Sequence, residues 1–111
     1  MAETYKNFKG VLNITEGTFY TCPPDTIAIV QMMQIANVTG VDPADASVFW
    51  TDASDSDAET HLCFGSEVVK GDAVNVNAAS LVLEAGDTIG GFGSDDGALE
   101  LSGSVLEITN A

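Results

Sequence analysis

Apolar residues in this chain recur in short runs that alternate with polar residues, and the runs are separated by segments rich in Gly, Pro, Asp and Asn. Short alternating runs are typical of β-strands, and no long stretch has the spacing of an amphipathic helix. The pattern predicts an all-β protein, an antiparallel β-sandwich of about seven or eight strands.

The longest predicted strand covers residues 26–36, TIAIVQMMQIA. Strict alternation divides its apolar side chains between two faces, with Ile27, Ile29, Met33 and Ile35 on one and Ala28, Val30 and Met32 on the other. Because both faces are largely apolar, we expect a second sheet to cover one of them and a neighbouring subunit to cover the other.

Two further predicted strands carry aromatic residues. The first begins at Ala46, after a polar connection over residues 37–46, and places Phe49 and Trp50 on opposite faces. We therefore expect one of these rings in the core and the other at the surface or at a contact. The second strand, THLCFGSEVV, places Leu62 and Phe64 on a shared face.

Residues 81–106, LVLEAGDTIGGFGSDDGALELSGSVL, combine strand patterns with a glycine-rich and acidic centre. A dinucleotide-binding loop would need glycine where Asp96 stands, and a helix after it where this chain has a strand pattern. The phosphate interpretation therefore fails. We predict strands at LVLE and at ALELSGSVLEI, a turn at EAGD, and a hairpin tip at GGFGSDDG.

The closing strand changes its alternation partway along. Leu99, Leu101 and Val105 share one parity, whereas Leu106 and Ile108 share the other. Such a change of parity indicates a bulge or bend, which we place near Gly103 because glycine is common at bulges.

The charge of the chain is strongly acidic and narrows the choice of partners. Among its 111 residues, 17 are acidic, three are lysine and none is arginine, which leaves a formal net charge of -14. Nucleic-acid binding needs cations to neutralise phosphates, and anionic membrane surfaces would repel this chain as well. We therefore expect neither a nucleic-acid partner nor a membrane partner.

Two of the three lysines, Lys6 and Lys9, lie in the first ten residues, beside Tyr5 and Phe8. An ordinary solvated terminus is the simpler interpretation of this segment, and the alternative is an extended N-terminal arm over residues 1–10 that lies along a neighbouring subunit. Residues 11–111 have the size of one sandwich domain. No stretch resembles a signal peptide or a membrane span.

Candidate catalytic chemistry is sparse. The single histidine, His61, lacks a recognisable nucleophile or triad motif around it, and the acids are too numerous for any pair to be informative. Cys22 and Cys63 have no metal-binding spacing and are expected to be small buried hydrophobes. We predict that the protein is not an enzyme and needs no cofactor.

The acidic loop at residues 52–59 leaves one alternative open. Its carboxylates at Asp52, Asp55, Asp57 and Glu59 could converge on calcium, although their spacing matches no calcium-binding loop motif. A solvated turn without metal is the simpler interpretation. The alternative is a calcium-dependent carbohydrate-binding module, with Trp50 as a platform on which a sugar ring stacks.

The order of four segments resembles a group of small virion proteins of tailed bacteriophages. These segments are FYTCPPDTIAIVQMMQIANVTG, VFWTDAS, LVLEAGDTI and ALELSGSVLEI, and the resemblance runs from about Thr18 to Ile108. It implies a β-sandwich or jelly-roll protein of the virion, such as a capsid decoration (cement) protein, and it carries no catalytic residues. The alternative within this group is a neck, tail or fibre module. The Cys22–Pro23 pair and the acidic loop depart from the pattern.

The resemblance also implies partners and a location. The expected partners are the major capsid protein or other virion proteins and further copies of this chain, as a dimer or trimer. The expected location is the capsid exterior, after synthesis in the host cytoplasm. We predict the contact residues from the aromatic, methionine and lysine side chains: Tyr5, Lys6, Phe8, Lys9, Met32, Phe49 and Trp50.

Overall fold

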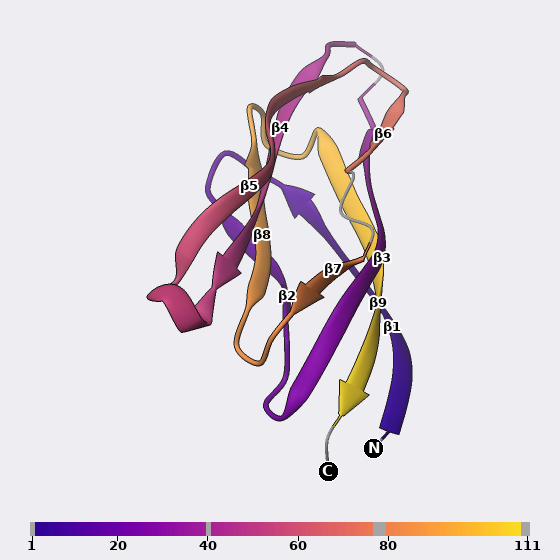
Figure 1. Cartoon of the computed structure of the whole chain (residues 1–111). Coiled ribbons are helices and arrows are strands. Elements are labelled where there is room, and N and C mark those ends of the chain that lie inside the picture. The colour runs from indigo at the N-terminus through magenta and orange to yellow at the C-terminus, as the bar shows by residue number, and fades with distance from the viewer. Residues whose placement is uncertain (1, 40, 77–79, 110–111) are drawn as a thin grey trace.

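The computed structural model describes residues 2–39, 41–76 and 80–109, and almost all of its regular structure is β-strand (Figure 1). One short 3-10 helix, η1 (Ala53–Asp55), lies in a loop. The strands are β1 (Ala2–Leu12), β2 (Gly17–Thr21), β3 (Thr26–Asn37), β4 (Ala44–Asp52), β5 (Ala58–Val68), β6 (Ala73–Asn75), β7 (Leu81–Leu83), β8 (Thr88–Gly93) and β9 (Leu99–Thr109). The predicted all-β class is confirmed. Within these residues no helix is long and apolar enough to span a membrane.

The strands form two antiparallel sheets. Sheet A has the order β1-β9-β3, and both β6 and β7 pair with the far edge of β3. Sheet B has the order β2-β8-β4-β5. The chain crosses repeatedly between the sheets, and this strand order is that of a jelly roll. The described residues contain nine strands, whereas the sequence pattern predicted seven or eight. The count is higher because two short strands, β6 and β7, pair with different parts of the same edge of β3.

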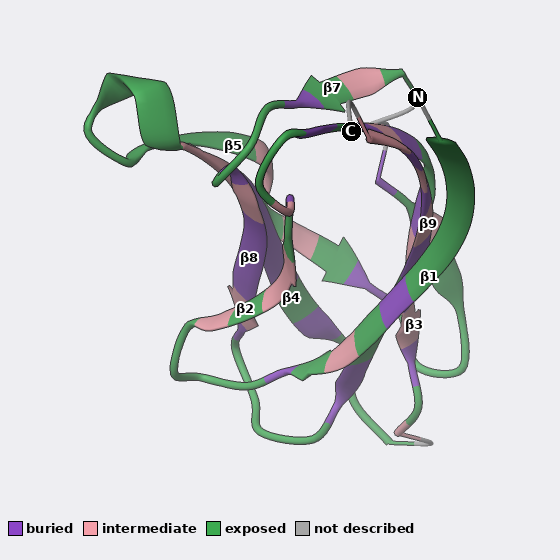
Figure 2. Ribbon diagram, turned by 90° about the horizontal axis from the view of Figure 1, so that it is seen from below, coloured by how far each residue is buried: buried purple, intermediate pink, exposed green. Residues whose placement is uncertain are grey.

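The core lies between the two sheets, and Figure 2 shows buried positions on strands of both layers. Its largest fully buried side chains are aliphatic: Leu12, Met33, Ile35, Leu83, Ile89, Leu99, Leu101, Val30, Val48, Val68 and Val105. Cys22 is buried in this core and Cys63 is half-buried against it, both as free thiols. Burial of such side chains from both sheets is the main source of stability in a sandwich.

A β-bulge in β3 corrects the predicted faces of that strand. The pairing of β3 with β9 shifts register between Val30 and Met32, so Gln31 is an extra residue. Ala28 and Val30 face the core before the bulge, and Met33 and Ile35 face it afterwards. One extra residue reverses the parity of everything that follows it, so strict alternation gave the wrong partition.

The bulge predicted near Gly103 is also wrong, because β9 alternates regularly from Leu99 to Thr109. The inward positions continue through Gly103 and Val105 to Glu107, which is buried. Glycine is needed at 103 for another reason: a Cβ there would lie 2.4 Å from the ring of Phe8 and 2.9 Å from the carbonyl oxygen of Met32. The irregularity belongs to the neighbouring strand, β3.

The predicted hairpin tip at GGFGSDDG is mostly an inner strand. Residues Thr88–Gly93 form β8, between β2 and β4, and only the segment 94–97 turns. A Cβ at Gly91 would lie 2.5 Å from the carbonyl oxygen of Ser47, and one at Gly93 would lie 2.9 Å from that of Leu12. These glycines therefore permit close packing of the backbone and do not mark a loop.

The predicted N-terminal arm over residues 1–10 differs from the structure. Ala2 to Leu12 pair with β9 along the whole of β1, which forms an edge of sheet A. Phe8 is buried in the core. The side chains of Phe8 and Leu12 are buried in this chain's own core, so the segment belongs to the sandwich domain.

Candidate interaction surfaces

Apolar side chains gather on the outer face of sheet A. One row crosses four strands: Tyr5 pairs with Leu106, Leu106 with Ile29, and Ile29 with Val82. Tyr5 is 72% exposed and Val82 is 48% exposed. These residues point outward because their neighbours along each strand face the core, and successive side chains alternate between faces.

Two adjacent rows extend this surface. The paired residues Ile27 and Ile108 lie on one side of the row, and Met32 lies on the other. We call the seven residues together the sheet A patch: Tyr5, Ile27, Ile29, Met32, Val82, Leu106 and Ile108. Contiguous exposed apolar residues on an acidic protein are characteristic of a contact surface.

The same face becomes polar towards the other end of the strands. Lys9 pairs with Ser102, and Glu100 pairs with both Val11 and Ala36. A shallow hollow of about 500 Å³ lies over these residues. The sheet A patch is thus bounded by neutral and charged groups at this end.

A second exposed apolar group lies on the outer face of sheet B. Phe49 is buried against the backbone of β8, since a Cβ at Gly90 would lie 2.9 Å from its ring. The His61 ring lies 5.6 Å from the Phe49 ring, and the Phe64 ring lies 5.1 Å from that of His61, both edge to face. We call Phe49, His61 and Phe64 the aromatic ladder.

Phe64 is 72% exposed and is directed outward by a bulge in β5. Phe64 and Gly65 together oppose Ser47, whose hydroxyl accepts the Gly65 N–H at 3.0 Å, and Gly65 has a φ of 62°. The predicted shared face of Leu62 and Phe64 is wrong, because a second register shift, between Val48 and Phe49, makes Leu62 an extra residue that packs against the core. Bulges commonly redirect a side chain in this way.

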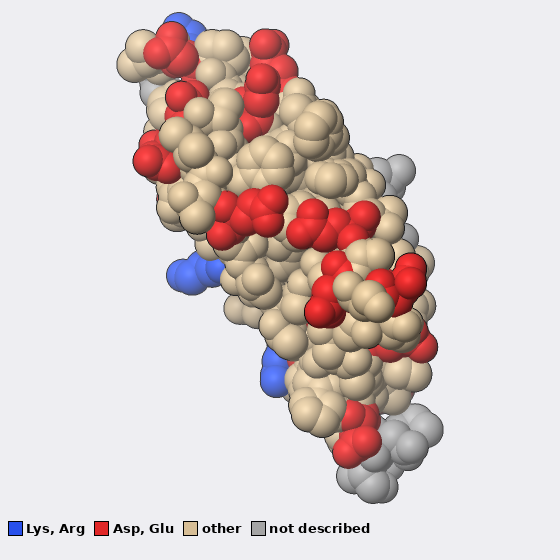
Figure 3. Space-filling view, turned by 90° about the vertical axis from the view of Figure 1, so that its left-hand side faces the viewer, with Lys and Arg blue, Asp and Glu red and all other residues tan. Residues whose placement is uncertain are grey.

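Acidic side chains form separate groups on the side of the molecule where β5 and η1 lie, and the lysines are at the margin of that view (Figure 3). Neutral surface lies between these groups. A protein partner that binds this side must therefore either avoid the carboxylates or pair with them.

Buried Asp87 organises one end of the sandwich. The turn predicted at EAGD is confirmed, with the Asp87 N–H donating to the Glu84 carbonyl at 2.9 Å and Gly86 at a φ of 90°. The Asp87 carboxylate accepts hydrogen bonds from the N–H groups of Ala53 and Glu84, both at 2.9 Å, and from the Trp50 indole at 3.3 Å. It therefore joins the turn to η1 and β4.

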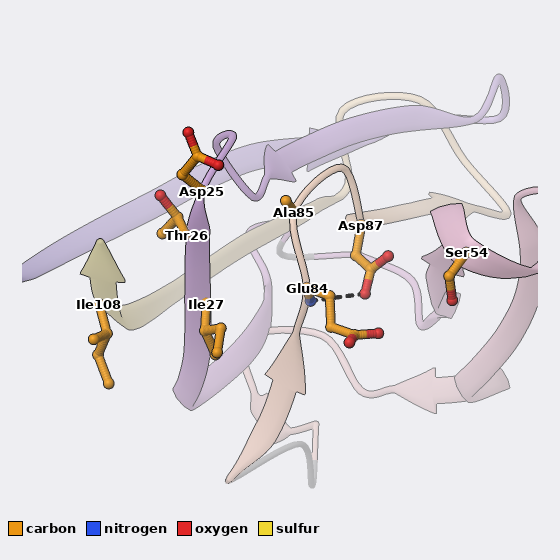
Figure 4. Close-up of a pocket in the computed structure, with 8 residues that line it drawn as sticks. All are labelled: Asp25, Thr26, Ile27, Ser54, Glu84, Ala85, Asp87 and Ile108. Atoms are coloured by element: carbon orange, nitrogen blue, oxygen red, sulfur yellow. Dashed lines mark hydrogen bonds between the residues drawn. The ribbon is translucent and has the colours of Figure 1, made fainter. Parts of the chain in front are cut away.

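One carboxylate oxygen from each of Asp52, Glu84 and Asp87 lies within 4.8 Å of the others. Glu84 and Asp87 also line a hollow of about 610 Å³ (Figure 4). Of the four acids considered for calcium, Asp52 belongs to this group, and its Oδ1 accepts hydrogen bonds from the N–H and hydroxyl of Ser54. The donors around Asp87 give it a structural role. The Trp50 indole is engaged with Asp87 and with the core, which argues against Trp50 as a sugar platform.

Buried Glu107 connects three strands at the end of the sandwich where the termini lie. The Tyr20 hydroxyl donates to its Oε2 at 2.5 Å, and Lys6 Nζ lies 3.1 Å from its Oε1. Burial, and next the hydrogen bond to Glu107 and the charge of Glu107, raise the pKa of the Tyr20 phenol. Lys6, predicted as an intermolecular contact, is thus bound to its own chain.

The raised pKa of Tyr20 predicts a loss of stability in alkaline solution. Above about pH 10 the unfolded chain releases the phenol proton while the folded chain retains it, so rising pH favours unfolding. Urea unfolding followed from pH 8 upward should show this decline, and the Tyr20→Phe variant should show a smaller one. Tyr5→Phe, at an exposed tyrosine, should retain the wild-type pH dependence. Identical profiles for wild type and Tyr20→Phe would contradict the prediction.

The predicted contact residues fall into distinct places. Tyr5, Met32 and Lys9 lie on the outer face of sheet A, and Phe49 lies at the base of the aromatic ladder. Phe8 is buried, and Trp50 is half-buried against the core. The structure therefore brings Tyr5 and Met32 together but separates them from Phe49 and Trp50.

Sequence reasoning missed most of the sheet A patch. Ile27 and Ile29 were assigned to the same face as Met33, and the bulge at Gln31 reverses that assignment. The sequence pattern of Leu106 led only to the prediction of a bulge near Gly103, and not to its place on the outer face. The available signal was Glu107, since a charged residue at a core-facing parity leaves its apolar neighbours outside.

Comparison with known proteins identifies the fold without assigning a family. No family model and no curated protein matches the chain. A subunit of the disulfide-linked pili of Bacillus endospore appendages is similar in structure, with a TM-score of 0.60 and 12% identity over 99% of this chain and 88% of that one. At this identity the likeness shows a shared fold.

Chains from two infectious bursal disease virus structures are more distant. The Gt strain structure has a TM-score of 0.43 and 7% identity over 96% of this chain and 31% of that chain. The T13 particle has a TM-score of 0.40 and 10% identity over 95% and 30%. Likeness at this level supports no inference about this chain.

Proposed function

We propose that this protein is a structural component of a tailed-bacteriophage virion, a capsid decoration subunit that binds the major capsid protein on the outside of the head. The observation that carries the proposal is the aromatic ladder, in which Phe64 is 72% exposed yet held by an edge-to-face contact with His61, which in turn contacts Phe49. A preorganised aromatic side chain loses little entropy on binding and is a common anchor at protein interfaces.

Three further features support this role. The four-segment resemblance to tailed-phage virion proteins covers most of the chain, and the jelly-roll sandwich is an architecture that viral capsid domains use. The acidic surface would be repelled by packaged DNA, as suits a protein on the capsid exterior. We include the absence of catalytic activity in the proposal, because the single histidine lies between two phenylalanine rings.

The test is co-sedimentation of the purified protein with empty heads that lack it. Wild-type protein should bind saturably, with many copies per head. Phe64→Ala should weaken binding by about 30-fold or more, as for an interface hot spot of about 2 kcal/mol. Its stability should change by less than about 1 kcal/mol, because the ring is mostly exposed.

Val41→Ala is the matched control, because Val41 is 74% exposed in the loop between β3 and β4, away from the aromatic ladder. It should bind heads as the wild type does. Failure of the wild-type protein to co-sediment with heads would refute the decoration role. Equal weakening by the two substitutions would remove the ladder as the contact.

The second candidate is a neck, tail or fibre module of the same virion. The structural likeness to a pilus subunit favours it, because that protein is built into a filament. Quantitative mass spectrometry of purified particles distinguishes the two. A copy number close to that of the major capsid protein supports decoration, and a small number set by neck or tail symmetry supports the alternative.

A further inference from the structure

We propose that the outer face of sheet A binds the same face of a second copy of this chain. The sheet A patch presents one continuous apolar row from β1 to β7, with Tyr5 at one end and Val82 at the other. This surface lies on the opposite sheet from the aromatic ladder. The inference is therefore independent of binding to heads.

The size of the face suits a dimer. Three strands of about 11 residues, with the short β6 and β7 beside them, give an area of roughly 600 Å² at about 3.3 Å per residue and about 4.8 Å between strands. A standard protein interface buries about 800 Å² on each partner. The face, with the side chains at its margins, reaches the area that a stable pair needs.

Charge selects this face for self-association. Two copies that each carry a net charge of -14 repel each other wherever their carboxylates meet. In the paired rows of the sheet A patch, the other residues are neutral Asn7 and Ser104 and one acid, Glu3, at the β1 corner. Two further acids, Asp25 and Glu84, lie only at the margin of the patch, where they line a hollow with Ile27 and Ile108. A cationic partner would be attracted to the acidic groups elsewhere, whereas a neutral apolar face fits another such face.

The strand register shows how the two faces can match. A two-fold axis parallel to the strands, between β9 and β3, places β9 of each copy over β3 of the other. Leu106 then faces Ile29 of the second copy, and Ile108 faces its Ile27. At the polar end, Glu100 faces Ala36 and not another carboxylate. An isologous contact of this kind closes as a dimer.

Sedimentation equilibrium of the full chain tests the inference. The wild type should have twice the 11.5 kDa chain mass at micromolar concentration. Added salt should tighten the association, because screening reduces repulsion between the acidic subunits without weakening apolar contact. A contact built on ion pairs would weaken instead.

Val82→Glu places a carboxylate within the patch and should raise the dissociation constant at least about 30-fold, a hot-spot effect of about 2 kcal/mol. Val69→Glu is the matched control, since it adds the same charge at a site of similar exposure, 53% against 48%, beyond the end of β5. This control should remain dimeric. If Val82→Glu does not fold, Tyr5→Ser provides the same test at the other end of the row.

A wild type that stays monomeric at 100-fold higher concentration would overturn the inference, as would equal effects of Val82→Glu and Val69→Glu. If the wild type is monomeric and Val82→Glu alone abolishes binding to heads, the face takes a capsid protein instead of a second copy. A dimer that fails to bind heads would refute the decoration role and leave this inference standing.

Discussion

Replacing Asp87 by alanine is expected to destabilise the protein by about 3 to 5 kcal/mol, a large part of the 5 to 15 kcal/mol typical of a domain. The carboxylate is 1% exposed and accepts three hydrogen bonds, from Ala53, Glu84 and Trp50. Alanine would leave these donors without their acceptor in a place that water reaches poorly. Urea unfolding followed by the fluorescence of the single tryptophan, Trp50, measures the loss at the site itself.

Two companion variants separate charge from position. Asp87→Asn keeps the shape of the side chain but turns an NH2 group towards backbone donors, so most of the loss should remain. Asp55→Ala removes a carboxylate from the neighbouring exposed loop and should change stability by less than about 0.5 kcal/mol. If the free energy of unfolding of Asp87→Ala lies within about 1 kcal/mol of the wild-type value, the hydrogen-bond network does not have the structural role assigned to it.

The second large effect is expected at Gly91. The Gly91→Ala variant should lose about 3 kcal/mol or more, because its Cβ would lie 2.5 Å from the carbonyl oxygen of Ser47 and 3.1 Å from Leu12 Cδ2. The first contact is with backbone of the adjacent strand β4, which cannot move away without breaking the ladder between β8 and β4. Thermal and urea unfolding both report the loss.

Gly71→Ala is the control for the replacement of a glycine as such. Gly71 has a φ of 70° but nothing within 4 Å of an added Cβ, so its cost should be only about 1 kcal/mol of backbone strain. Comparable losses at the two sites would show that conformational strain, and not the close approach of β8 to β4, explains the glycines of the inner strand.

The two exposed apolar surfaces have different physical characters. The sheet A patch is broad and flat and lies on paired strands, whereas the aromatic ladder presents one prominent ring raised by a bulge. A flat symmetric surface suits a copy of itself, and a raised anchor suits a pocket on a different protein. Contacts on opposite sheets would allow one subunit to bind both partners at once.

Local patterns in the sequence were sufficient to predict the fold class. The strand predicted over residues 26–36, the polar connection before β4, the acidic loop and the EAGD turn all correspond to observed features. They could be predicted because side-chain alternation and turn chemistry depend on neighbours along the chain. The strand at LVLE is also present, although it is short.

Other features depend on what lies across the ladder or between the sheets, and only the tertiary structure decided them. The bulge at Gln31 reverses the faces of β3. The glycines of β8 lie in an inner strand, where the backbones of β4, β1 and β2 approach closely. Residues Ala2–Leu12 pair with a strand about 100 positions later, and a contact between such distant segments leaves no signal in the local pattern of either one. The sequence by itself determined that this chain forms a sandwich, whereas the pairing of distant strands determined which apolar residues remain outside it.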